Sequence, residues 1–225
     1  ARRVAVVVAG GGPPAVTREQ LGDLGDRPVV VAADEGLQHA EALGLRVDLV
    51  VGDMDSVDPG ALAAAGAAGV PLQRHPAAKD ATDLELALDA ALAAEVDRVV
   101  VVTGTGDRLD HTMAVALTVS APDLVAAATV EAWIGPAHVW VVAGEASLAG
   151  RPGELVSLLP AHGPAVGVTT SGLLYPLADE DLPAGIGRGV SNEWVEEVAT
   201  VRVRSGILLA VAPGPPGEDG PRAPR

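Results

Sequence analysis

The pattern of hydrophobic positions divides the chain into two regions. Up to about residue 134, short runs of consecutive apolar residues alternate with segments of helical periodicity. Apolar runs without polar alternation are typical of strands that are covered on both faces. The predicted strands are Val4–Ala9, Val29–Ala33, Asp48–Val51, Val70–His75 and Val99–Val102.

Predicted helices lie between these strands, and their ends carry capping residues. Asp58 is an N-cap candidate ahead of Pro59, and Thr82 forms a capping box with Glu85. Alternating strands and helices predict a parallel α/β sheet. The predicted helices are Glu35–Leu43, Pro59–Ala68, Asp83–Ala94 and His111–Ser120.

After residue 134 the segments become short, rich in Val and Leu, and separated by Gly and Pro. This texture predicts a small antiparallel β domain, either a sandwich or a barrel. We therefore expect an α/β domain over residues 1–134, a β domain over 135–212 and a disordered Pro/Gly-rich tail over 213–225. The predicted β-domain strands are His138–Val142, Leu155–Leu159, Ala165–Thr169, Val198–Val203 and Ile207–Val211.

Charge and composition exclude several classes of function. The formal net charge of -15 makes the chain a poor ligand for nucleic-acid backbones. There is no Cys, so disulfides and thiolate metal sites are excluded. The longest uncharged run, Leu155–Ala178, is interrupted by Gly and Pro, and the first residues do not resemble a secretory signal. We expect a cytoplasmic protein with no nucleic-acid or membrane partner.

Acidic residues follow the predicted strands of the first region. In open parallel sheets, ligands bind outside the carboxyl ends of the strands, so these loops should face one crevice. Crowded carboxylates repel one another unless a cation neutralises them, and Mg²⁺ prefers oxygen ligands and substrate phosphates. The residues at this edge are Asp34, Asp53, Asp55, Lys79, Asp80, Asp83, Asp107, Arg108 and Asp110.

Each motif alone has a structural alternative. Asp favours turns, Asp83 would be favourable at a helix N-terminus, Asp110 could be an N-cap, and Arg108 could pair with Asp107. These alternatives do not explain why every cluster falls at the same sheet edge. Gly10–Pro13 could let a phosphate or ribose approach the backbone, but it matches neither G-x-G-x-x-G nor a P-loop.

Six segments occur in the order seen in thiamine pyrophosphokinases, and the chain resembles that family over nearly all its length except the tail. The segments of the α/β region are Ala32–Gly36, Asp48–Ser56, Lys79–Glu85 and Arg108–Thr112; those of the β region are Gly172–Leu177 and Gly189–Glu193.

The resemblance implies a parallel-sheet α/β domain followed by an antiparallel β-sandwich, in a homodimer with the active site at the subunit interface. It implies Mg-dependent transfer of pyrophosphate from ATP to the thiamine hydroxyl, giving thiamine diphosphate and AMP. Carried over, Asp53, Asp55 and Asp83 are the magnesium ligands and are catalytic with Arg108 and Asp110. The residues expected to contact nucleotide or thiamine are Asp34, Lys79, Thr82, Arg108, His111, Ser191 and Asn192.

The chain departs from the family pattern at Glu35 and Asp107, where Gly is usual, and at Val115, where Asn is usual. These departures motivate two alternatives: a catalytically silent nucleotide- or thiamine-binding paralogue, and a metal-dependent phosphohydrolase. Trp194 follows the last motif; it could stack on a pyrimidine ring, although a core or interface position is the favoured interpretation.

Overall fold

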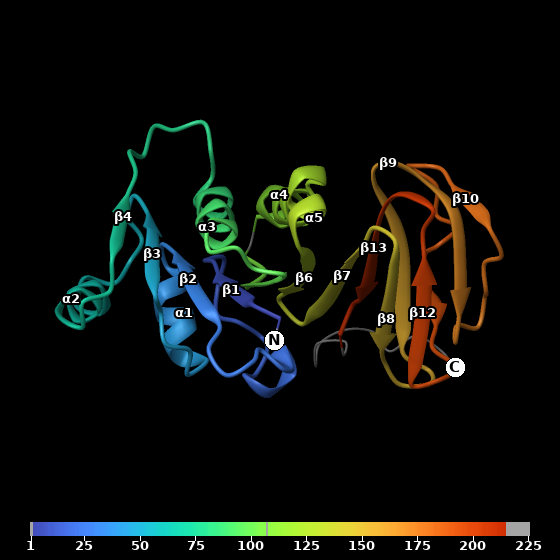
Figure 1. Cartoon of the computed structure of the whole chain (residues 1–225), viewed down its shortest axis with the longest axis horizontal. Coiled ribbons are helices and arrows are strands. Elements are labelled where there is room, and N and C mark those ends of the chain that lie inside the picture. The colour runs from blue at the N-terminus through green and yellow to red at the C-terminus, as the bar shows by residue number, and fades with distance from the viewer. Residues whose placement is uncertain (1, 107, 215–225) are drawn as a thin grey trace. The chain divides into compact units, whose positions relative to one another are not determined.

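The computed structural model describes residues 2–106 and 108–214. The chain divides into two compact units between Gly135 and Pro136. Figure 1 shows helices and strands alternating in the first unit, whereas the second unit is built from strands. Most of the motifs that point to chemistry therefore lie in the first unit.

The first unit contains a parallel sheet with the strand order β4-β3-β2-β1-β5-β6. Its strands are β1 (Val4–Val8), β2 (Val29–Ala33), β3 (Leu49–Gly52), β4 (Leu72–Arg74), β5 (Arg98–Thr103) and β6 (Thr129–Ile134). Its helices are η1 (Glu19–Leu21), α1 (Gly36–Ala42), α2 (Pro59–Ala67), α3 (Asp83–Leu92), α4 (Leu109–Val119) and α5 (Pro122–Ala127).

Burial on both faces explains the unbroken apolar runs in the sequence. Every residue of β1 is buried, and alternate side chains of β1 lie on opposite faces of the sheet. Val6 and Val8 join a core that includes Leu37 and Ala40 of α1, while α3 packs against β1, β2 and β3. The prediction of a doubly covered parallel sheet is confirmed.

The predicted caps are also present. Asp58 accepts a hydrogen bond from the Ala61 N–H with Pro59 at the first position of α2, and Thr82 and Glu85 form the capping box of α3. Asp110, in contrast, is not an N-cap, because Arg108 holds that position in α4 and makes no side-chain capping bond.

Strand order reverses direction at β1, which places a topological switch point in the middle of the sheet. From β1 the chain moves outward to β2, β3 and β4, and then returns to pair β5 on the other side of β1. In open parallel sheets, ligands bind outside the carboxyl ends of the strands at such a point.

The second unit consists of antiparallel strands. These are β7 (Ala137–Val142), β8 (Glu145–Ala149), β9 (Leu155–Ser171), β10 (Glu180–Leu182), β11 (Asn192–Glu193), β12 (Val198–Arg202) and β13 (Ser205–Ala212). β13 pairs with β7 and β9, and β12 pairs with β8 and β9. Trp194 lies in the core of this unit with Leu148, Leu158 and Leu208.

The prediction of separate strands at Leu155–Leu159 and Ala165–Thr169 is wrong, because both belong to the 17-residue strand β9. Gly163 and Pro164 do not end the strand. His162 and Gly163 adopt positive φ values of 58° and 140°, and the register with β13 shifts between Ser205 and Ile207. This irregularity bends β9 so that its second half also pairs β10 and β12.

Several elements of the structure were not expected from the sequence. β6, β8, β10, β11, η1 and α5 were not predicted, and α5 begins at Pro122. Asp107 and most of the predicted disordered tail lie outside the described residues. Within the described part of the chain, no helix has the length and apolar character needed to cross a bilayer.

Candidate active site at the carboxyl ends of the parallel strands

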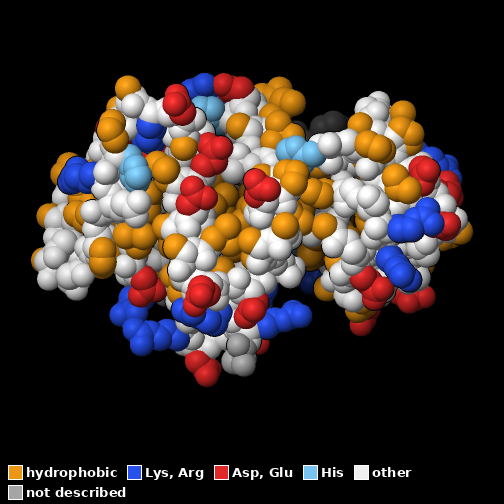
Figure 2. All heavy atoms as spheres, turned by 45° about the horizontal axis from the view of Figure 1, so that its top comes forward, with side chains coloured by type: hydrophobic (Ala, Val, Ile, Leu, Met, Phe, Trp, Pro, Cys, Tyr) orange, Lys and Arg blue, Asp and Glu red, His pale blue; other side chains and the backbone are white. Residues whose placement is uncertain are grey.

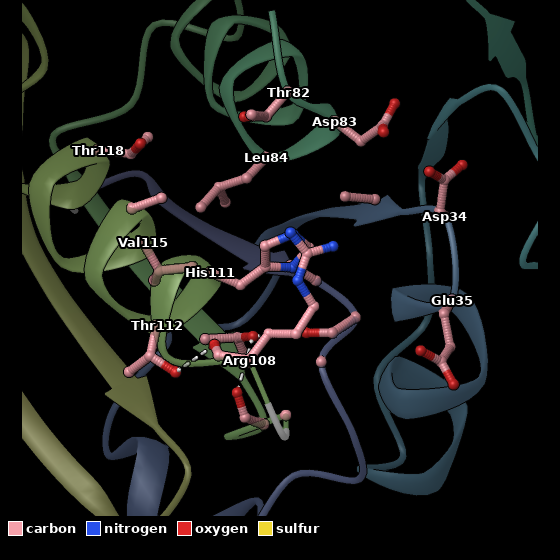
Figure 3. Close-up of a pocket in the computed structure, with 18 of the residues that line it drawn as sticks. Asp34, Glu35, Thr82, Asp83, Leu84, Arg108, His111, Thr112, Val115 and Thr118 are labelled. Carbon is pink, nitrogen blue, oxygen red and sulfur yellow. Dashed lines mark hydrogen bonds between the residues drawn. The ribbon is translucent and has the colours of Figure 1, made fainter. Parts of the chain in front are cut away.

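A pocket of about 440 Å³ opens at the switch point of the parallel sheet (Figure 3). It is lined by residues that follow β1, β2 and β5, together with the first turns of α3 and α4. Its volume falls within the usual range for small-molecule and cofactor sites. Among the predicted site residues, those that line it are Asp34, Thr82, Asp83, Arg108 and His111, and the departures Glu35 and Val115 line it as well.

Backbone forms the wall between β1 and β5. The Thr103 hydroxyl donates a hydrogen bond of 2.5 Å to the Gly10 carbonyl. A Cβ atom on Gly104 would lie 2.3 Å from the Gly12 carbonyl oxygen, so the two glycine turns can approach this closely only without a side chain there. The approach leaves backbone groups, rather than bulky side chains, facing the pocket on this side.

Asp34 is held where β2 ends. Its φ of 45° is unusual for a residue other than Gly, and its Oδ1 accepts a hydrogen bond of 3.0 Å from the Met54 N–H. Gly52 makes room for it, because a Cβ there would lie 1.9 Å from Asp34 Oδ1. Burial, and the nearby negative charges of Asp83 and Asp53, raise the pKa of Asp34 to about 6, although the bond from Met54 opposes this shift.

Lys79 connects the acidic residues of two loops. Its ammonium lies 2.9 Å from Asp83 Oδ1 and 3.7 Å from Asp53 Oδ2. The contact with Asp83 is the main cause that raises the pKa of Lys79. We call Asp34, Asp53, Asp55, Asp83 and Lys79 the acidic cluster.

Asp53 and Asp55 lie beside each other at the exposed edge of the acidic cluster. The Asp55 N–H donates a hydrogen bond of 3.1 Å to Asp53 Oδ1, which lowers the pKa of Asp53. The side-chain contact between the two carboxyl groups, together with the charge of Asp53, raises the pKa of Asp55. The opposite shifts indicate that the protonation of one carboxyl group depends on that of the other.

The acidic cluster has the donor types that suit Mg²⁺. Asp83 Oδ1 is buried and accepts no hydrogen bond from the described residues; Lys79 pairs with it by charge. A buried carboxylate oxygen in this situation, beside other carboxylates, fits a hard divalent ion. The described residues do not, however, form a ready-made cage of three or more metal ligands. The magnesium assignment of Asp53, Asp55 and Asp83 therefore stays a prediction.

The N-terminal turn of α4 brings positive charge to the pocket. Arg108 donates hydrogen bonds of 3.2 Å and 2.6 Å to the two carboxylate oxygens of Asp110, and this contact raises the pKa of Arg108 and lowers that of Asp110. Arg108 and His111 project toward the centre of the pocket in Figure 3, opposite Asp34 and Asp83. Asp110 itself does not line the pocket, so its contact with Arg108 orients the guanidinium.

The predicted residues of the β unit have different environments. Ser191 is exposed, and its N–H donates a hydrogen bond to Ser157 Oγ. Asn192 is buried: its Oδ1 accepts from the Tyr175 N–H at 3.0 Å, and its Nδ2 donates to the Tyr175 carbonyl at 2.8 Å. Asn192 therefore fixes the backbone of Tyr175, whose side chain is 63% exposed.

Trp194 is a core residue, as favoured from the sequence. It is 1% exposed, and its indole plane lies so close to Gly150 that a Cβ there would be 2.3 Å from the ring. Ring stacking on a ligand is excluded for a side chain this buried. The sequence reasoning missed Tyr175 as a separate candidate, although it is the only Tyr of the chain and lies within a quoted motif.

Other lining residues were also missed from the sequence. Thr103 is the last residue of β5 and Gly104 follows it, and Ser56 follows the Asp53–Asp55 pair. The position at the end of a predicted strand was a signal that could have found Thr103 and Gly104. Leu84, Thr112 and Thr118, which were also missed, depend on the rotation of α3 and α4, which the sequence pattern does not determine.

Two family models match the sequence. Residues 24–125 match the thiamin pyrophosphokinase catalytic domain, and residues 146–208 match the thiamin pyrophosphokinase vitamin B1 binding domain. None of the curated proteins matches the chain.

Solved structures share the fold at low sequence identity. Thiamine pyrophosphokinase from Bacillus subtilis is 22% identical with a TM-score of 0.77, and the match covers 92% of this chain and 97% of that one. The enzyme from Geobacillus thermodenitrificans is 23% identical with a TM-score of 0.72, covering 96% and 99%. Thiamin pyrophosphokinase from Candida albicans is 14% identical with a TM-score of 0.74, covering 93% and 88%. Since the two family models cover most of both units, the chain belongs to the thiamin pyrophosphokinase family, whose members are ATP-dependent pyrophosphotransferases.

Proposed function

We propose that this chain transfers the pyrophosphoryl group of ATP to the hydroxyl of thiamine in a magnesium-dependent reaction, giving thiamine diphosphate and AMP. The observation that carries the proposal is that Asp34 and Asp83 of the acidic cluster line one pocket together with Arg108, while Lys79 joins Asp83 to the neighbouring Asp53. Phosphoryl transfer depends mainly on positioning and charge neutralisation, and these are the groups that supply both.

The residues that line the pocket and those beside it have distinct tasks in this proposal. Asp53, Asp55 and Asp83 would hold Mg²⁺, which when bound neutralises charge on the polyphosphate. Arg108, oriented by Asp110, and His111 bind phosphate oxygens from the opposite wall. Lys79, now paired with Asp53 and Asp83, becomes available to a phosphate once another cation satisfies those carboxylates. Thr82 contacts the nucleotide from the start of α3, and a carboxylate near the thiamine hydroxyl accepts its proton.

Thiamine recognition is assigned to the β unit, which we propose is a β-sandwich. The buried Asn192 holds the Tyr175 backbone, and the exposed Tyr175 ring offers an aromatic face. Thiamine carries an aromatic pyrimidine and a cationic thiazolium, both of which an aromatic ring attracts. Ser191 is exposed and supplies a hydroxyl.

A homodimer completes the proposal. Leu109, Met113 and Leu117 are 72%, 58% and 52% exposed and recur every four residues, so they share one face of α4. Figure 2 shows hydrophobic side chains on the surface of each unit. Exposed apolar patches of this kind mark interaction sites, and we propose that a second copy of the chain covers this face of α4. We also propose that the enzyme acts in the cytoplasm.

The test is direct. Purified protein is incubated with thiamine, ATP and Mg²⁺, and thiamine diphosphate and AMP are separated by chromatography. Asp55→Asn should abolish product without lowering the melting temperature, because Asp55 is exposed. Asp89→Asn, an exposed carboxylate elsewhere on α3, is the matched control. Phosphate release without thiamine, or no product with any nucleotide and divalent metal, would refute the proposal.

A further inference from the structure

Glu35 is a carboxylate in the pocket that the proposed chemistry does not use. It lines the pocket at the start of α1, directly after Asp34. Figure 3 shows its carboxylate directed away from those of Asp34 and Asp83. It reaches instead toward the glycine turn after β1, where a Cβ on Gly10 would lie 3.2 Å from Glu35 Oε2. Glu35 therefore faces a different part of the pocket from the acidic cluster.

The Glu35 carboxylate has unused capacity to accept hydrogen bonds. Within the described residues its carboxylate oxygens accept no hydrogen bond and meet no Lys, Arg or His. Asp34, its neighbour, already accepts a hydrogen bond from Met54. A negative charge at this position repels phosphate, so the ligand group that it suits is a neutral donor such as a hydroxyl.

The position of Glu35 just after β2 indicates which hydroxyl groups it would bind. In doubly wound domains that bind dinucleotides, an acidic residue about 20 residues after the glycine turn of the first strand accepts a hydrogen bond from the ribose. Glu35 follows β2 directly, and β2 pairs with β1, whose end carries Gly10 and Gly11. The chain lacks the usual glycine fingerprint, yet it retains this geometric relation between turn and carboxylate.

We propose that Glu35 accepts hydrogen bonds from the ribose hydroxyls of the nucleotide and thereby makes the enzyme selective for ribonucleotides over deoxyribonucleotides. This inference rests on the proposed function, because it assumes that the pocket binds a nucleoside triphosphate. A hydrogen bond to a charged group is worth about 10- to 100-fold in affinity. That range sets the expected discrimination between ATP and 2′-deoxy-ATP.

The experiment compares ATP, 2′-deoxy-ATP, 3′-deoxy-ATP and GTP. Binding of each Mg-nucleotide without thiamine is measured by calorimetry, and kcat/KM for thiamine diphosphate formation is measured separately. The proteins are the wild type, Glu35→Ala, Glu35→Gln and the control Glu41→Ala, an exposed glutamate near the other end of α1. Circular dichroism verifies that each variant is folded.

The expected result is about 10- to 100-fold weaker binding of at least one deoxynucleotide by the wild type. Glu35→Ala should weaken the binding of ATP and so reduce this preference to within about threefold. Glu35→Gln should retain part of the preference, and Glu41→Ala should retain all of it. A wild type without ribose discrimination, or a Glu35→Ala variant that keeps it, overturns the inference. The inference is also overturned if the Glu35 variants change the preference between ATP and GTP rather than the preference for the ribose.

The two proposals fail in different ways. Discrimination in binding without any thiamine diphosphate would refute the proposed function and leave the role of Glu35 intact. Turnover with equal use of ATP and both deoxynucleotides would leave the proposed function intact and refute the role of Glu35. If no nucleotide binds, both are refuted.

Discussion

At the scale of single residues, the pKa of Asp34 should make the stability of the protein depend on pH. Its pKa is raised from 3.8 to about 6, so between these values the folded protein binds a proton that the unfolded chain releases. The free energy of unfolding of the metal-free protein should therefore fall as pH rises through this window. Because Asp34 is only half-buried, we expect a loss of about 1–2 kcal/mol.

Asp34→Asn should remove this pH dependence while keeping an oxygen for the Met54 N–H. Urea unfolding in a chelator at several pH values between 4 and 7 measures it. The matched control is Asp89→Asn, which changes an exposed carboxylate. An unchanged slope in Asp34→Asn would contradict the assigned cause of the pKa shift.

Lys79 is the second residue whose role can be separated from the fold. Lys79→Met removes the cation that lies near Asp53 and Asp83 and leaves their charges uncompensated. The metal-free variant should lose on the order of 1 kcal/mol of stability, and Mg²⁺ should raise its melting temperature more than that of the wild type.

Differential scanning calorimetry with and without Mg²⁺ provides the measurement for Lys79→Met. Arg74→Met, which removes an exposed cation of β4, should leave the magnesium-induced shift unchanged. Equal shifts in Lys79→Met and the wild type would mean that Lys79 and Mg²⁺ do not compete for the same carboxylates.

At the scale of elements, sequence patterns predicted what local burial and capping determine. β1, β2 and β5 were recognisable because both faces of the sheet are covered, and α2 and α3 because Asp58 and Thr82 cap them. β9 was divided wrongly, since Gly163 and Pro164 resemble a turn and the antiparallel pairing that carries the strand through them is not local.

The site was predictable to the same degree. Asp34 and Asp83 line one pocket, and the sequence pointed to this sheet edge because parallel strands bring their carboxyl ends together. The contact of Lys79 with both Asp53 and Asp83 depends on side-chain geometry between two loops. The hydrogen bonds between the Asn192 side chain and the Tyr175 backbone likewise join residues distant in sequence. The motif therefore pointed to Asn192 but did not predict its partner.

The glycine turns give a prediction at the element scale. Gly104→Ala would place Cβ 2.3 Å from the Gly12 carbonyl oxygen, so the loops after β1 and β5 must separate at a cost of about 1–3 kcal/mol. Gly66→Ala, where no atom lies within 4 Å of the new Cβ, should instead stabilise α2 by about 0.5–1 kcal/mol. Chemical denaturation of both variants measures the change in the free energy of unfolding. Equal changes in the two variants would contradict the close packing of the turns after β1 and β5.

At the scale of the whole molecule, the pocket and the proposed thiamine residues belong to different compact units. Every residue that lines the pocket lies in the first unit, whereas Tyr175, Ser191 and Asn192 lie in the second. ATP binding and thiamine-dependent turnover can therefore be separated experimentally. In the proposed homodimer, loss of the partner copy should affect turnover while ATP still binds.

The apolar face of α4 tests this separation. Leu109→Glu combined with Met113→Glu introduces two charges on exposed positions of α4, and Glu is a good helix former, so the fold should be retained. If a second copy covers this face, burying two carboxylates should dissociate the dimer at micromolar concentration. Light scattering after size-exclusion chromatography measures mass, with Ala63→Glu on exposed α2 as the control. We expect a monomer that binds Mg-ATP like the wild type and has lost thiamine diphosphate formation; a monomer with full turnover would show that one copy holds both substrates by itself.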